Sequence, residues 1–147
     1  MTVARDEICN LLYRYTEAID AGDFEGLSVL FATAVLLNAD GSLRSDTPDH
    51  MLARWRGRIM LYDGVPRTRH LTMNPIIHID EQAGTAQARS AYIVFQVTDS
   101  FPLQAVIFGR YHDRFARSGH GQWAFASRQF FVDGQGDLSH HLNYPAC

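Results

Sequence analysis

The stretch TAQARSAYIVFQVT, residues 85–98, decides the fold class of this chain. In its second half Ile93, Phe95 and Val97 alternate with the residues between them. A period of two is typical of a β-strand that has two different faces. The stretch exceeds the usual strand length of about 3–10 residues. We therefore expect it to belong to a strongly curved or bulged antiparallel sheet.

Further strands are predicted on both sides of this stretch. One begins at His70 and precedes it. Two others cover residues 102–115 and 122–132, and the glycine-containing turn at residues 118–121 separates them. Because Gly109 lies in mid-strand, it is a candidate position for a bend.

The N-terminal part of the chain shows helical spacing of its apolar residues instead. One helix is predicted over residues 8–19, with Gly22 as its stop and Asp23 as the N-cap of the next helix, over residues 24–31. A third helix is expected to begin at residues 46–48, where a proline is tolerated in the first turn.

Helices at the front and a curved antiparallel sheet behind them predict an α+β domain. A cone-shaped sheet closed by the N-terminal helices would enclose an apolar interior, which is a natural ligand pocket. At 147 residues, with no linker or repeat, residues 1–147 are expected to form a single domain.

Composition excludes several classes of function. All 13 basic residues are arginine, and without lysine there is no Schiff-base catalysis, no lysine-anchored pyridoxal phosphate and no Walker-type phosphate site. The net charge of −3 offers no basic footprint for nucleic acid. Cys9 and Cys147 provide neither a disulfide framework nor metal-ligand spacing. We expect no cofactor and no metal.

The apolar content of 46%, with 20% charged residues, is that of an ordinary soluble globular protein. No apolar run approaches the roughly 18 residues that a membrane span requires. The charged start, Met1 to Glu7, does not resemble a signal peptide. A cytoplasmic location without membrane contact is therefore the expectation.

Three polar residues lie beside apolar positions of the predicted helices and strands: Asp20, His70 and Arg128. Asp20 is at the end of the first helix, against the helix dipole, where it is either a solvated surface residue or retained for a partner. His70 is at the mouth of the first long strand. A lone histidine is more often structural, but an imidazole paired with a carboxylate suits proton transfer near neutral pH. Arg128, on an apolar strand face, needs either an ion pair with a helix carboxylate or an anionic ligand.

Other residues are weaker candidates for ligand contact. Tyr15, Tyr92 and Trp55 would line the pocket or belong to an aromatic core, and the Tyr92 hydroxyl needs a polar partner. Asn74 follows His70 and could assist it. Near the end of the chain, the histidines at 140–141 could fold over the pocket mouth, although an exposed tail is the plainer interpretation.

The chain resembles the SnoaL-like group of the nuclear transport factor 2-like superfamily. The resemblance rests on Tyr13 through Phe31, Arg69-His70 with Asn74-Pro75, and Gly109-Arg110-Tyr111 through Trp123 and Arg128. It extends from Ile8 to about Leu142. The superfamily includes polyketide cyclases, scytalone dehydratase, hexachlorocyclohexane dehydrochlorinase, ketosteroid isomerases and the non-catalytic small subunits of ring-hydroxylating dioxygenases.

The resemblance implies a cone-shaped α+β barrel with a pocket between helices and sheet. Asp20 matches the helix-end aspartate of the dehydratase and dehydrochlorinase dyad, His70 its histidine, and Arg128 the strand arginine of the dehydrochlorinase. The match has gaps, because Ala18 and Ile19 do not supply the tyrosine found near the dehydratase aspartate. The dehydrochlorinase pocket lysine cannot exist here.

The sequence thus favours a cofactor-independent lyase or isomerase (dehydratase, double-bond isomerase or cyclase) acting on a small apolar or aromatic carbonyl-type compound. The alternative is a non-catalytic ligand-binding or assembly subunit similar to the small dioxygenase subunits. A homodimer is also expected, because one face of the sheet needs cover. That face is expected to carry Phe95, Val97, Phe108 and Phe131 in some combination.

Overall fold

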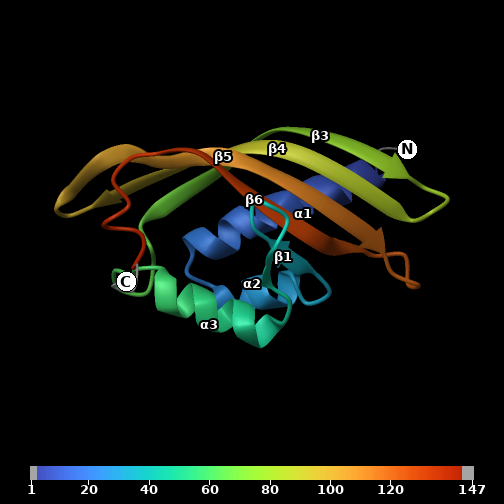
Figure 1. Cartoon of the computed structure of the whole chain (residues 1–147), viewed down its shortest axis with the longest axis horizontal. Helices are drawn as coiled ribbons and strands as arrows, with labels where there is room; N and C mark the ends of the chain where they lie inside the picture. The colour runs from blue at the N-terminus through green and yellow to red at the C-terminus, as the bar shows by residue number, and fades with distance from the viewer. Residues whose placement is uncertain (1–2, 144–147) are drawn as a thin grey trace.

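The computed structural model describes residues 3–143, in which a curved sheet arches over three helices (Figure 1). In chain order the elements are α1 (Val3–Asp20), α2 (Phe24–Leu30), β1 (Val35–Leu37), β2 (Leu43–Ser45), α3 (Pro48–Arg58), β3 (Thr68–Asp80), β4 (Thr85–Thr98), β5 (Phe101–Arg117) and β6 (Trp123–Gln135). The α+β class and the helix-covered, cone-like sheet predicted from the sequence are confirmed.

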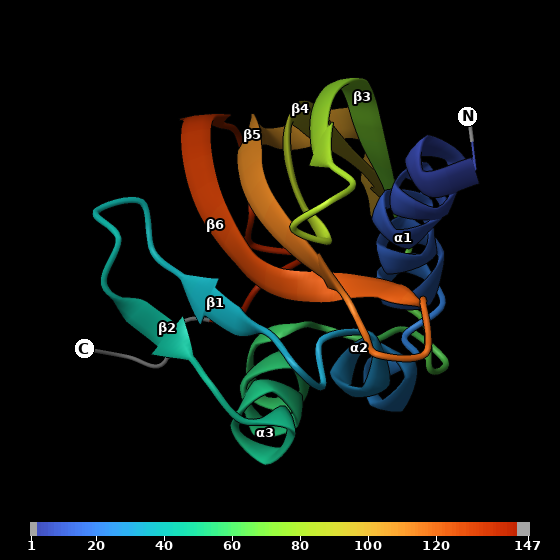
Figure 2. The same ribbon diagram turned by 90° about the vertical axis from the view of Figure 1, so that its right-hand side faces the viewer.

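The sheet has six strands in the order β2-β1-β6-β5-β4-β3 and is not closed. Every neighbouring pair is antiparallel except β1 and β6, which run parallel. The sheet predicted from the sequence was antiparallel throughout. The exception is at the short β1–β2 hairpin, which lies between α2 and α3 in the chain. Its strand β1 joins the free edge of β6 (Figure 2).

The long strands bend through irregularities in their pairing. Register shifts occur in β3 between Met73 and Ile76, and between β5 and β6 at Phe108/Gly109. Gly109 makes the second shift possible, since a Cβ atom there would lie 1.8 Å from the carbonyl oxygen of Phe131. The expected curvature, with Gly109 at a bend, is confirmed.

Local sequence signals set the helix ends. α1 ends before Gly22, whose φ of 71° suits glycine, and the Asp23 side chain accepts a hydrogen bond from the backbone N–H of Gly26 to cap α2. Thr47 caps α3 in the same way, accepting from the backbone N–H of His50, and Pro48 lies in the first turn.

The core lies between the concave side of the sheet and the helices. α1 packs mainly on β3 and buries one face of regularly spaced apolar residues: Ala4, Ile8, Leu11, Leu12, Tyr15 and Ile19. Burying a large apolar side chain contributes about 1.5–3 kcal/mol, so this face fixes the end of α1 against the start of β3.

After β6 the chain passes from the sheet to the C-terminal end of α3 as residues 136–143, here called the C-terminal strap (Figure 1). The His141 carbonyl accepts from the backbone N–H of Met60, and the His140 carbonyl accepts from the Tyr62 hydroxyl and the Gln96 side-chain amide. The strap is thereby fixed to the loop after α3.

None of the helices within residues 3–143 is both long and apolar enough to cross a bilayer. Cys147 lies outside the described residues, and Cys9 is half-buried in α1.

Candidate active site

A cavity of about 230 Å³ lies between the helices, the concave side of the sheet and the C-terminal strap. Its lining combines aromatic and aliphatic side chains with a few polar groups. The lining residues are Tyr15, Ile19, Leu36, Arg44, Arg54, Trp55, Arg58, Ile59, His70, Tyr92, Val94, Ile107, Tyr111, Phe130, Val132, Gln135, His141 and Leu142. Apolar walls with convergent polar groups are typical of a small-molecule site.

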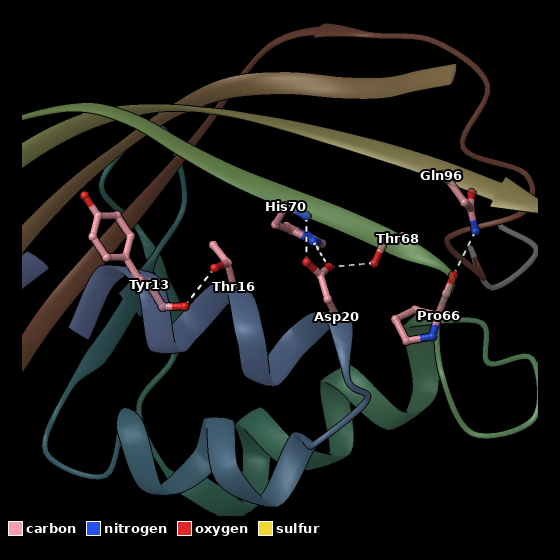
Figure 3. A network of polar contacts seen from close by, with 7 residues as sticks. All are labelled: Tyr13, Thr16, Asp20, Pro66, Thr68, His70 and Gln96. Carbon is pink, nitrogen blue, oxygen red and sulfur yellow. Dashed lines mark hydrogen bonds and ion pairs between the residues drawn. The ribbon is translucent and has the colours of Figure 1, made fainter. Parts of the chain in front are cut away.

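His70 lines this cavity and is hydrogen-bonded to Asp20 behind it, and Figure 3 shows the contacts between the two residues. Asp20 is the last residue of α1, and His70 is the third residue of β3. The Asp20 carboxylate accepts the ring Nδ1–H of His70 at 2.6 Å, the backbone N–H of His70 at 2.8 Å and the hydroxyl of Thr68 at 2.9 Å. The helix end and the strand are thus joined through one carboxylate.

This hydrogen-bond pattern fixes the tautomer of His70. Because Nδ1 donates its proton to Asp20, Nε2 carries the lone pair in the neutral ring. The His70 side chain is only 6% exposed and lines the cavity, and the Asp20 side chain is 13% exposed. The arrangement presents a shielded imidazole base backed by a carboxylate.

A second imidazole faces the cavity from the C-terminal strap. The His141 ring centroid is 6.1 Å from that of His70. Burial, with the nearby His70, lowers the pKa of His141 to about 4, so its ring is neutral at pH 7. The exposed-tail interpretation is wrong for His141, because the strap returns to the end of α3 and places this ring, only 5% exposed, in the cavity wall. Only the sequence's weaker suggestion of a fold over the pocket mouth anticipated it.

Arg128 does not line the cavity. It is completely buried and forms a two-pronged ion pair with Asp113 of β5, at 2.7 and 2.9 Å. The rings of Tyr15 and Tyr111 lie 4.5 and 3.8 Å from its guanidinium carbon and separate it from the cavity. This corrects the expected ligand contact of Arg128, since the ion-pair partner comes from a neighbouring strand.

Three of the four expected substrate-contact residues line the cavity: Tyr15, Tyr92 and Trp55. The Tyr92 hydroxyl donates to the Phe131 carbonyl at 2.9 Å, and burial raises its pKa to about 12. Asn74 is elsewhere. It occupies the bulge of β3 with a φ of 55° and is exposed, so it does not reach the cavity.

Three arginines of the cavity wall are absent from the site residues predicted from the sequence. Arg44 comes from β2, and Arg54 and Arg58 come from α3; all three are half-buried. Burial lowers the pKa of Arg44, and the positive charge of Arg58 lowers it further. Burial and the positive charge of Arg58 also lower the pKa of Arg54. The spacing of four between Arg54 and Arg58 was the available signal, because it places both on one helix face.

A second hollow, of about 300 Å³, is lined only by strand residues, and its acid, Asp113, is hydrogen-bonded to Arg128 rather than to an imidazole. Its two histidines are His78 and His112. Across residues 3–143, no three histidine, cysteine or acidic side chains gather as metal ligands would.

Solved structures with this fold come from several bacteria. A protein of unknown function from Mycobacterium tuberculosis is 27% identical, with 89% of this chain and 72% of that chain covered and a TM-score of 0.70. A protein of Novosphingobium aromaticivorans, provisionally assigned as a scytalone dehydratase, is 21% identical, with 92% and 87% covered and a TM-score of 0.71.

The beta subunit of a provisionally assigned aromatic-ring-hydroxylating dioxygenase from the same organism is also 21% identical, with 92% of both chains covered and a TM-score of 0.70. No curated protein matches the chain closely enough to count as a relative. The model of the SnoaL-like domain family matches residues 2–129. The chain therefore belongs to the SnoaL-like domain family.

Proposed function

We propose that this protein is a cofactor-independent lyase or isomerase, in which His70 removes a proton from carbon next to the carbonyl group of a small apolar or aromatic compound. One observation carries the proposal. The hydrogen bond between Asp20 and the Nδ1–H of His70 leaves Nε2 of a shielded ring as a base at the cavity wall. The cavity is small beside the usual 300–1,000 Å³ of ligand sites, which favours a compact ligand.

The proton and the electron pair would move as follows. Nε2 of His70 takes the proton, Asp20 stabilises the resulting imidazolium, and the C–H electron pair passes into the carbonyl to form an enolate. If the imidazolium returns the proton to another carbon, a double bond has migrated. If it protonates a departing β-hydroxyl, water is eliminated and a new C=C bond remains. If the enolate carbon attacks a second carbonyl, the C=O π bond opens to an alkoxide, the imidazolium protonates that alkoxide, and a ring has closed.

Tyr15 is the proposed donor to the enolate oxygen. Its ring lines the cavity, and burial raises the pKa of its hydroxyl, which keeps the proton in place for donation. Arg128 takes a positioning role in this proposal, because its guanidinium packs against the rings of Tyr15 and Tyr111 rather than against the ligand.

A carbon-acid probe tests the base without knowledge of the natural substrate. Nitrobenzisoxazole is compact, and removal of its ring proton breaks the N–O bond and releases a coloured cyanophenolate. General-base catalysis contributes about 10²–10⁴-fold, so His70→Gln should lower the protein-dependent rate by about that factor. His78→Gln is the matched control, since it changes an exposed histidine of the same strand.

Equal rates for the wild type and His70→Gln would remove the proposal, provided that circular dichroism shows both proteins to be folded. The alternative function is an assembly subunit, for which the likeness to the dioxygenase beta subunit is the specific observation. In that case the chain should co-purify with a larger partner, and His70→Gln should change neither the complex nor any rate.

A further inference from the structure

We propose that the ligand of this cavity carries a carboxylate and that Arg44, Arg54 and Arg58 bind it. The three guanidiniums come from β2 and α3, whereas His70 is on β3, the strand at the opposite edge of the sheet from β2. The ligand would therefore extend from an anionic end near the arginines to a carbon that faces the imidazole. Only the position of that reacting carbon rests on the proposed function.

The first support is that these arginines form no ion pair with an acid of residues 3–143. The ion pairs among residues 3–143 involve His70 or other arginines, and none reaches Arg44, Arg54 or Arg58. The chain has 16 acidic residues and a net charge of −3, so acidic partners are not scarce. A half-buried cluster of positive charge without an acid is an unfavourable arrangement that an anionic ligand would relieve.

The second support is that the cluster is oriented toward the cavity. Arg54 and Arg58 are four residues apart and share one face of α3. Arg56, between them, faces away and pairs with Glu25. Arg44 is held in place, because its Nε donates to the Asn38 side-chain oxygen at 3.0 Å and its guanidinium lies 4.5 Å from the centre of the Phe130 ring.

The rest of the lining favours a carboxylate over a phosphate. Apart from the arginines and the two histidines, the cavity wall is mostly aliphatic and aromatic. A monoanion costs less to transfer into such a space than a dianion does. A planar carboxylate also matches the flat guanidinium fork, which can donate two parallel hydrogen bonds.

Calorimetric titration of the whole protein tests the site with three probes of similar size: naphthoate, its methyl ester and naphthyl phosphate. A hydrogen bond to a charged group contributes about 1.5–3 kcal/mol. We therefore expect naphthoate to bind at least about tenfold more tightly than the ester. Arg54→Gln and Arg58→Gln should each remove most of this preference. Arg56→Gln, on the same helix, should retain it.

Equal affinity for acid and ester, or tighter binding of the phosphate, would overturn the proposal. Salt supplies a readout that needs no variant. The affinity of naphthoate should fall between low and physiological ionic strength while that of the ester stays constant, because partly exposed charges are screened. A salt-independent affinity for naphthoate would count against the site.

The two proposals can fail separately. A preference for the acid in the His70→Gln protein, combined with an undiminished rate on nitrobenzisoxazole, would leave the carboxylate site and remove the base. If His70→Gln lowers the nitrobenzisoxazole rate but the protein binds naphthoate and its ester equally, the base remains and the carboxylate site is removed.

Discussion

At the scale of single residues, Asp20 joins the fold and the candidate site. Its carboxylate accepts from the ring and the backbone of His70 and from Thr68, so the end of α1 is fixed to β3 by the same bonds that orient the imidazole. The position of Asp20 in the sequence, taken alone, favours a solvated surface residue over a partnered one. What settles the geometry is the packing of α1 on β3, which brings together residues fifty positions apart.

His141 makes stability depend on pH. Its pKa in the folded protein is about 4, against 6.5 for an ordinary histidine. Between these values the unfolded chain binds more protons, so stability should fall as the pH drops from 6.5 to 4. The full effect is about 3 kcal/mol. In urea unfolding over this range, His141→Gln should show a shallower pH dependence than wild type. An unchanged slope would contradict the burial of the ring.

The Asp113–Arg128 pair should matter most for stability. Asp113→Asn leaves the buried guanidinium without its counter-ion, and breaking a buried pair costs about 3–5 kcal/mol. Chemical denaturation should report a loss of that size. Replacing both partners, Asp113→Leu with Arg128→Met, should restore part of it. Asp133→Asn is the control, because Asp133 pairs with Arg110 between the same strands at the surface and should change stability little. Equal losses for Asp113→Asn and Asp133→Asn would contradict this account.

These residues show where sequence reasoning stops. The Asp20–His70 pair was predictable from the resemblance to the SnoaL-like group, because the two residues match its dyad, whereas neither position alone required a partner. The partner of Arg128 was not, since it depends on the strand register that places Asp113 opposite Arg128. The apolar stripe of α3 was predictable, but the grouping of Arg54 and Arg58 with Arg44 was not, because it depends on where β2 lies in the fold.

At the scale of elements, the bulge between β5 and β6 brings the Tyr92 hydroxyl to the Phe131 carbonyl. A Cβ atom on Gly109 would lie 1.8 Å from that carbonyl oxygen and 2.8 Å from that hydroxyl. Gly109→Ala should therefore force β6 aside and cost about 1–3 kcal/mol, seen as a lower melting temperature. Gly119→Ala is the control, because a Cβ atom there meets nothing within 4 Å. A Gly109→Ala melting curve that matches wild type would refute the close approach.

The longer strands were predictable from their alternation, and their bulges from their excess length. The parallel pairing of β1 with β6 was not, because three residues carry too little pattern to reveal a direction. That pairing continues the sheet to β2 and so brings Arg44 to the cavity.

At the scale of the whole molecule, the homodimer remains a prediction. Large apolar side chains stay half-exposed on the sheet, among them Val97, Phe108 and Leu103 at 45%, 52% and 69%. Burial of such surface drives association. Light scattering at micromolar concentration should give the mass of two chains, and Phe108→Asp should shift it toward one. A wild-type mass of one chain would refute the prediction.

The C-terminal strap has a consequence for how this scaffold diversifies. Within residues 136–143, the bonds to the rest of the molecule use main-chain atoms of the strap: the N–H groups of Gly136 and Asn143 and the carbonyls of His140 and His141. These bonds place no demand on the identity of the strap's side chains, although Leu138 packs in the core. Two other side chains of the strap, those of His141 and Leu142, form part of the cavity wall. Randomising these two positions while Leu138 is kept therefore offers a route to new ligand preferences on an unchanged frame.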